Sequence, residues 1–130
     1  MLRYFKYYPV SLFVVSAIWY LSFFTPPQSS LNDIPYMDKI VHVCMYGGLS
    51  TTLWIEYLIH HRFLAPKRVV AGAIVCPALM SGCIEMLQAT CTDTRSGDWL
   101  DFAANCTGII LASLAGYCLW RPLIRKHLQK

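Results

Sequence analysis

Residues 85–105 read EMLQATCTDTRSGDWLDFAAN, and this stretch decides how the rest of the chain is organised. It holds four of the seven acidic residues, although apolar sequence flanks it on both sides. Carboxylates at the ends of apolar membrane segments are costly unless a partner or a function compensates for them. The stretch therefore predicts two apolar helices that meet at a polar site.

The composition indicates an integral membrane protein. Of the 130 residues, 56% are hydrophobic and only 14% are charged, whereas about a quarter of a soluble domain is charged. The apolar residues lie in long blocks, and no sizeable soluble domain is left once these blocks are set aside. We expect one all-α domain over residues 1–130, a four-helix bundle in the lipid bilayer.

Four apolar segments are predicted to cross the membrane, at about 8–24, 38–59, 69–89 and 101–120. The first has a basic start, as a secretory signal does, but two prolines follow it in place of a cleavage pattern, so we expect it to be retained. Pro77 should interrupt the third segment mildly, and the tail after residue 120 should fray or lie at the interface. Small residues in the last two segments favour close helix contacts and would also support a homo-oligomer.

The basic residues predict the orientation. Nine of the eleven Lys and Arg residues lie in the N-terminus, the link at 60–68 and the tail, which leaves Lys39 and Arg95 on the other side. The positive-inside rule then places both termini in the cytoplasm. Because the basic residues form no single patch, nucleic acid is not an expected partner. Glu56, near the cytoplasmic end, is expected to reach Arg62 or Lys67.

The six cysteines include no Cys-x-x-Cys pair. We interpret Cys44, Cys76, Cys83, Cys106 and Cys118 as small buried hydrophobic residues, and we place Cys91 in a link. Cys91 could pair with Cys106 on an oxidising side of the membrane, but nothing in the sequence requires it.

Three segments carry polar residues at the same depth. His42 and Asn105 lie one turn after the starts of their segments, and Glu85 lies one turn before the end of its own. At 1.5 Å per residue, each is about 6 Å inside the extracytoplasmic boundary. Spacings of three and four residues extend each position into a stripe, and such stripes must face away from lipid. We expect them to converge on a polar pocket open to the extracytoplasmic side.

The residues of this expected pocket have candidate roles. His42, Glu85 and Asp101 are candidates for acid–base catalysis. The candidates for binding a ligand are Asp38, Lys39, Tyr46, Gln88, Arg95, Asp98 and Asn105. As an alternative, Asp38, His42, Glu85 and Asp101 could gather around manganese or iron, although no cofactor is predicted. Lys39 and Arg95 would hold a phosphate or carboxylate.

Each polar residue also has a structural interpretation. Asp38 and Asp101 could cap their helices. His42 could pack while hydrogen-bonded to Glu85 or Asn105. Glu85 could form a salt bridge with a basic residue on the same side, Lys39 or Arg95. The protein would then be a non-catalytic scaffold whose polar cluster stabilises the bundle.

These motifs resemble the VanZ-like family of small bacterial membrane proteins. The matching residues run through the last three segments, about two thirds of the chain, and read Asp38-Lys39-x-x-His42-x-x-x-Tyr46, Glu85-x-x-Gln88, Arg95 and Asp101-x-x-x-Asn105-x-x-Gly108. The sequence departs at Ala112, where many members carry glycine. The resemblance implies a multi-pass protein of the bacterial cytoplasmic membrane with no established biochemical activity.

The family takes its name from an accessory factor in resistance to the glycopeptide teicoplanin. The resemblance therefore suggests an envelope glycolipid, a cell-wall precursor or a glycopeptide as partner. Whether a reaction is catalysed stays open at the level of sequence.

Overall fold

The computed structural model describes residues 2–24, 34–91 and 97–128, and within these ranges the chain is all-helical, without a β-strand. The helices are α1 (Leu2–Tyr7), α2 (Pro9–Phe23), α3 (Met37–His60), α4 (Pro66–Val69), α5 (Cys76–Cys91), α6 (Trp99–Ala115) and α7 (Arg121–Leu128). Two π-helical segments, η2 (Val70–Val75) and η3 (Gly116–Trp120), join α4 to α5 and α6 to α7 without a break.

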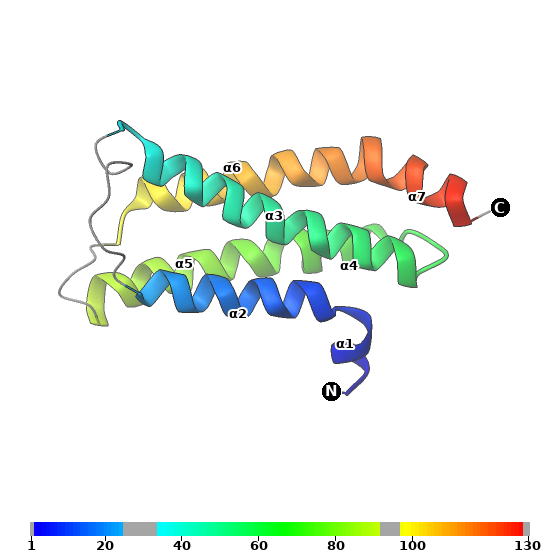
Figure 1. The fold of residues 1–130 in the computed structure, drawn as a ribbon, viewed down its shortest axis with the longest axis horizontal. Helices are drawn as coiled ribbons and strands as arrows, with labels where there is room; N and C mark the ends of the chain where they lie inside the picture. Colours follow the sequence, from blue (N-terminus) through cyan, green and yellow to red (C-terminus); the bar gives the residue numbers. More distant parts are fainter. Residues whose placement is uncertain (1, 25–33, 92–96, 129–130) are drawn as a thin grey trace.

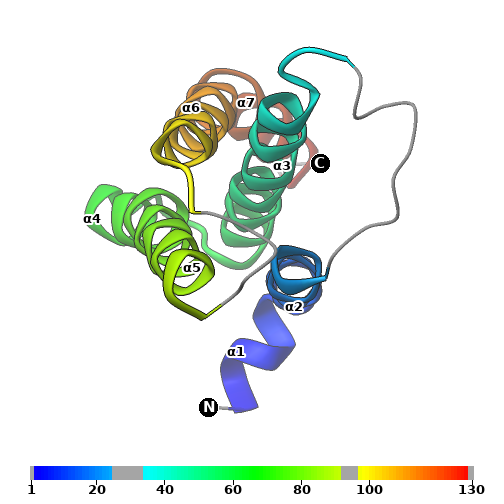
Figure 2. The ribbon, with the colours of Figure 1, turned by 90° about the vertical axis from the view of Figure 1, so that its left-hand side faces the viewer.

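The long helices lie side by side. Four helical rods follow the long axis of the molecule (Figure 1): α2, α3, the continuous α4–α5 rod and the continuous α6–α7 rod. The view along that axis shows them around a common interior (Figure 2). α1 projects away from them (Figure 2). The start of α3, the end of α5 and the start of α6 lie at one end, and both chain termini lie toward the other (Figure 1). The polar stretches identified in the sequence are therefore grouped at a single end.

The observed helix bounds differ from the expected segments mainly at the helix ends that the sequence predicts to face the cytoplasm. The third helical rod begins at Pro66, and the fourth continues to Leu128 rather than fraying after residue 120. Within the described ranges, two rods are long and apolar enough to cross a membrane, Pro66–Cys91 and Trp99–Leu128. α2 is apolar but has only 15 residues. α3 does not meet the same criterion, because polar and charged side chains along it, among them His42 and Glu56, make it less apolar.

The buried apolar side chains form two clusters along the long axis. One consists of Ile18, Tyr46, Leu49, Ile84 and Ile109. The other, toward the chain termini, consists of Trp54, Tyr57, Leu58, Val69 and Ala73. Because α3 contributes to both, it is the central helix of the fold, and its polar side chains face neighbouring helices.

α3 and α6 approach each other closely where two glycines meet. A Cβ atom on Gly108 would lie 2.3 Å from the carbonyl oxygen of Val43 and 2.9 Å from the nitrogen of Gly47. No side chain fits there without separating the helices, so glycine sets this spacing. The contact lies one turn below Asn105 and thus fixes the distance between the helices that carry the site.

Prolines explain both π-helical segments. η2 ends two residues before Pro77, and η3 ends two residues before Pro122. Proline has no N–H and its ring crowds the carbonyl four residues earlier, and a wider π turn relieves that crowding. The carbonyl of Ala73, four residues before Pro77, accepts a hydrogen bond from the Ser50 hydroxyl at 2.8 Å instead. The mild interruption expected at Pro77 is therefore a π-helical turn stabilised by α3.

Glu56 has different partners from those expected. Its carboxylate accepts the N–H groups of Val10 at 2.8 Å and Ser11 at 3.1 Å, and the Ser11 hydroxyl at 2.5 Å. The first N–H groups of a helix have no partner within the helix. Glu56 therefore caps α2 from α3, and the described ion pairs do not include the expected pairing with Arg62 or Lys67.

The expectation that Cys44, Cys76, Cys83, Cys106 and Cys118 are buried is wrong. All six are free thiols, and all except the half-buried Cys106 are exposed on helix surfaces. A small polarisable thiol is compatible with an apolar exterior as well as with a core. Cys91, expected in a link, is the last residue of α5.

Candidate functional site

Local capping determines which carboxylate enters the site. Asp98 is the N-cap of α6, and its side chain accepts the N–H of Leu100 at 2.9 Å. Asp101, the cap considered from the sequence, lies instead in the first turn of α6 and contacts α3. Asp38 is likewise in the first turn of α3 and does not cap it, because the N-cap position belongs to Tyr36.

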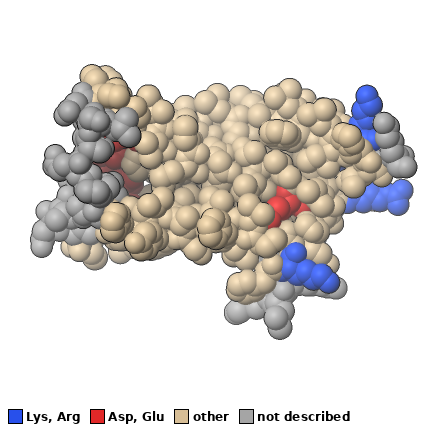
Figure 3. Space-filling model, viewed as in Figure 1, with Lys and Arg blue, Asp and Glu red and all other residues tan. Residues whose placement is uncertain are grey.

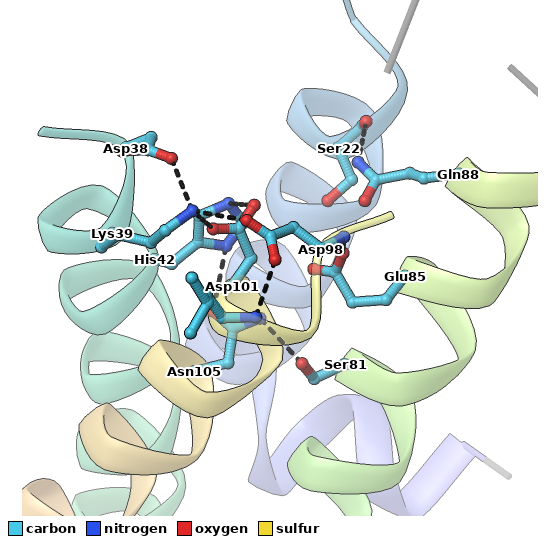
Figure 4. Close-up of polar contacts among 11 residues, drawn as sticks. Ser22, Asp38, Lys39, His42, Ser81, Glu85, Gln88, Asp98, Asp101 and Asn105 are labelled. Carbon is cyan, nitrogen blue, oxygen red and sulfur yellow. Dashed lines mark hydrogen bonds and ion pairs between the residues drawn. The ribbon is translucent and has the colours of Figure 1, made fainter. Parts of the chain in front are cut away.

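Lys39 binds three carboxylates. Its Nζ lies 2.8 Å from Asp38 Oδ2, 2.8 Å from Asp98 Oδ2 and 2.5 Å from Asp101 Oδ1 (Figure 4). An ammonium group has three donors, so each is engaged. The hydrogen bond from Lys39, with that from the N–H of Leu100, lowers the pKa of the Asp98 carboxyl below its ordinary value. Lys39 is therefore not a free anchor for a phosphate, as the sequence suggested.

His42 is held by Asn105, one of the two partners considered from the sequence. The Nδ1 atom of His42 lies 3.0 Å from Asn105 Oδ1, while Asn105 Nδ2 donates to Ser81 Oγ at 2.7 Å. Because the amide oxygen only accepts, Nδ1 carries the hydrogen and Nε2 has the lone pair in the neutral ring. Nε2 then faces Asp101 Oδ2 at 3.5 Å. Both Nε2 and Oδ2 are hydrogen-bond acceptors, so a shared proton or a donor group of a ligand would bridge them.

Glu85 is buried, with 5% of its surface exposed. Its Oε2 accepts the N–H of Asp98 at 3.1 Å, and it has no ion pair among the described residues. The link reaches α5 at this point because Gly97 allows it: a Cβ there would lie 2.3 Å from the carbonyl oxygen of Glu85. The salt bridge to Lys39 that the sequence suggested is absent from the described contacts, and Arg95 lies outside the described residues.

Three acceptor side chains converge at the centre of the site. One ligand atom from each of His42, Glu85 and Asp101 lies within 4.8 Å of the other two. Tyr46 is 2% exposed one turn below His42, and Ser81 lies beside its buried hydroxyl. Such a set can accept hydrogen bonds from a ligand, move a proton, or hold a cation. Asp38, included in the metal alternative from the sequence, is not part of this group.

Gln88 lies apart from the other candidates. Its amide nitrogen donates to the carbonyl oxygen of Ser22 at 2.7 Å, so it links α5 to α2 (Figure 4). Sequence reasoning missed Ser81 and Gly97. Ser81 is four residues before Glu85, and this helical spacing could have identified it. Gly97 gave no signal beyond being a glycine in a polar link.

Comparison of the chain with protein-family models, with characterised proteins and with solved structures gives no match. The resemblance to the VanZ-like family therefore stays a prediction from the motifs. What the site can bind has to be inferred from its own atoms.

Proposed function

We propose that this chain is a multi-pass, VanZ-like protein of the bacterial cytoplasmic membrane, with both termini in the cytoplasm. In this proposal, the site around His42, Glu85 and Asp101 opens to the extracytoplasmic side and binds a cell-envelope component. The two long apolar rods support the membrane location. So do large hydrophobic side chains exposed along the middle of the helices, such as Phe13, Leu79 and Leu111.

The distribution of charge supports the orientation. On the face shown in Figure 3, Lys and Arg lie toward the end that carries the chain termini, and the central part is almost free of charge. The described ion pairs lie at the other end, and they are formed among Asp38, Lys39, His42, Asp98 and Asp101. This separation is what the positive-inside rule predicts for cytoplasmic termini.

The three converging acceptors support a ligand that supplies hydrogen-bond donors. The described residues of the site include one ammonium, that of Lys39, and four carboxylates. Lys39 pairs with Asp38, Asp98 and Asp101, whereas Glu85 has no ion pair among the described residues. A further anion such as phosphate would be repelled by this excess of carboxylates, whereas hydroxyl and amino groups would supply the missing donors. Sugar hydroxyls and amino groups occur in lipid-linked cell-wall precursors, in envelope glycolipids and in glycopeptides such as teicoplanin, so these are the ligands we propose.

The geometry around His42 would also support acid–base chemistry on such a ligand. Asn105 fixes the ring so that Nε2 points its lone pair toward the acceptor group. A bound hydroxyl placed between Nε2 and Asp101 could transfer its proton to His42. Catalysis would be an additional property of the site, since binding requires only the acceptors.

A scaffold role is the second candidate, and the hydrogen bonds of Asn105 favour it. Asn105 on α6 bonds to His42 on α3 and to Ser81 on α5, so one side chain connects three helices. In that case the polar cluster would stabilise the bundle and bind no ligand. The two functions differ in what a conservative substitution would do.

The test uses a deletion strain of the source bacterium and its susceptibility to teicoplanin and other envelope antibiotics. The strain is complemented with wild type, Glu85→Gln, His42→Gln or Thr90→Ala; Thr90 is an exposed control on the same helix whose hydroxyl bonds only within the α5 segment. We expect Thr90→Ala to complement fully, and the two site variants to fail at normal membrane abundance and melting temperature in detergent.

Two other outcomes have defined meanings. Loss of complementation that follows loss of abundance and melting temperature would favour the scaffold role. Full complementation by both Glu85→Gln and His42→Gln would overturn the proposed ligand site.

A further inference from the structure

A second polar region lies at the opposite end of the molecule. A pocket of about 760 Å³ is formed between the end of α3, the link that follows it, and α7. Its polar lining consists of His60, His61, Arg62 and Arg125. None of the described residues that line it is acidic. The pocket is separate from the candidate site and was not indicated by the sequence.

Arg125 gives the clearest indication of a ligand in this pocket. Its Nη2 atom is buried and has no hydrogen-bond acceptor within the described part of the chain. A buried donor of a charged group is costly when it is unpaired. The one acidic residue near this end among the described residues, Glu56, is engaged by the start of α2. The described residues therefore leave Arg125 Nη2 able to donate to a ligand.

The two histidines add donors to the same pocket. The Nδ1 atom of His60 bonds the carbonyl oxygen of Glu56 at 2.8 Å, and that of His61 bonds the carbonyl oxygen of Tyr57 at 3.1 Å. Because a carbonyl only accepts, each ring carries a hydrogen on Nδ1 and keeps Nε2 for a ligand. Nε2 accepts from a protonated oxygen when the ring is neutral and donates to an oxyanion when it is charged.

The remaining lining is apolar and consists of Leu58, Ile59, Phe63 and Leu128. Phe63 is 78% exposed, although it is a large aromatic residue at the rim. A pocket with arginine and apolar walls would suit a molecule that has both an anionic group and a hydrocarbon part. Arginine binds phosphate oxygens in a bidentate manner, and basic pockets at the cytoplasmic side of membrane proteins hold anionic head groups.

We propose that this pocket binds the phosphate head group of an anionic phospholipid, with Arg125 and Arg62 on the phosphate. The proposal depends on the membrane location given above but not on the ligand site around His42. Its test therefore uses a binding measurement rather than antibiotic susceptibility, so that either proposal can fail without the other. If the chain were recovered without detergent extraction, the membrane location itself would fail.

The full chain, purified in detergent, is titrated with phosphatidylglycerol and, separately, with phosphatidylcholine, and bound lipid is measured by native mass spectrometry. We expect wild type to prefer phosphatidylglycerol. Arg125→Gln should weaken that binding by about ten-fold or more, because a charge-assisted hydrogen bond is lost. The matched control is Lys126→Gln, which removes the same charge from an exposed neighbour outside the pocket and should change affinity by less than about two-fold.

Folding is checked by circular dichroism and by the melting temperature of each variant. If Arg125→Gln does not fold, Arg62→Gln replaces it, because Arg62 is exposed in the link, and Lys67→Gln becomes its control. Equal weakening in the pocket and control variants would indicate diffuse electrostatic attraction and overturn the proposal. The absence of a preference for phosphatidylglycerol would do the same. Competition by inorganic phosphate at millimolar concentration would reassign the pocket to free phosphate and overturn the lipid assignment.

Discussion

The ammonium of Lys39 lies among three carboxylates that reach it from α3 and from the start of α6. Individually, exposed ion pairs contribute little, but here the side chain of Lys39 is largely covered, with 20% exposed, and the pairs form a network. The network leaves His42, Glu85 and Asp101 with acceptors that a ligand can use. At the scale of single residues, the site thus combines a lysine–carboxylate network that keeps an excess of negative charge with free acceptor atoms on His42, Glu85 and Asp101.

The lowered pKa of Asp98 predicts a dependence of stability on pH. A carboxyl whose pKa is lower in the folded state than in the unfolded state stabilises the protein above the unfolded value, about 3.9. This stabilisation is lost as pH falls through the lower folded value. Asp98→Asn keeps an N-cap oxygen for α6 but removes the charge. We expect the wild-type melting temperature to fall more steeply than that of Asp98→Asn as pH falls below about 4.

The measurement is the melting temperature in detergent across a pH series at low ionic strength. Asp38→Asn is a useful comparison, because it removes another carboxylate from Lys39 without affecting a cap. Parallel curves of melting temperature against pH for wild type and Asp98→Asn would show that the contact between Lys39 and Asp98 does not contribute to the pH dependence of stability.

At the scale of helices, close contact between α3 and α6 determines where the polar residues lie. Gly108 lies in close contact with the backbone of α3 at Val43 and Gly47, and Asn105 and Asp101 follow at helical spacing toward the site. Ser50 adds a second link from α3, since it bonds the Ala73 carbonyl that Pro77 leaves without its N–H partner. The position of α3 relative to α6 and η2 is therefore set by contacts with backbone atoms below the site.

Gly108→Ala is predicted to destabilise the protein by about 1–3 kcal/mol, a typical value for a side chain forced into a packed interior. The added Cβ would meet the Val43 carbonyl at 2.3 Å, so α3 and α6 must separate. The control is Gly48→Ala, because a Cβ at Gly48 meets nothing within 4 Å. The free energy of unfolding is measured by titration with a denaturing detergent. Equal stability of the two variants would contradict the close contact.

At the scale of the whole molecule, the two ends differ in chemistry. One end holds the carboxylate network and the other the arginine-lined pocket, and the surface between them is apolar on the face in Figure 3. In a membrane, this difference would place a site for hydrogen-bond donors on one side and a phosphate-binding pocket on the other. The membrane location is therefore the property on which both proposals depend, and the orientation decides which side each site faces.

Cysteine labelling tests that orientation. Cys91 is a free, exposed thiol at the end of α5, so the proposed topology places it on the extracytoplasmic side. A variant that keeps only Cys91, the other five being replaced by serine, should react with a membrane-impermeant maleimide in intact spheroplasts. A cysteine-free variant carrying Lys126→Cys should react only after permeabilisation. The reverse pattern would invert the topology and place the acceptor site in the cytoplasm.

The sequence alone determined the helical class, the approximate extent of the long helices and the grouping of His42, Glu85 and Asn105 at one end of the molecule. Hydropathy, proline positions and helical spacing are local properties, so they can be read along the chain. The tertiary structure decided which partners these residues have: Lys39 binds carboxylates, Gln88 reaches α2, and Glu56 caps a helix from another helix. Such pairings depend on how each helix is rotated and how closely its neighbour approaches, and these are fixed only when contacts such as that at Gly108 form.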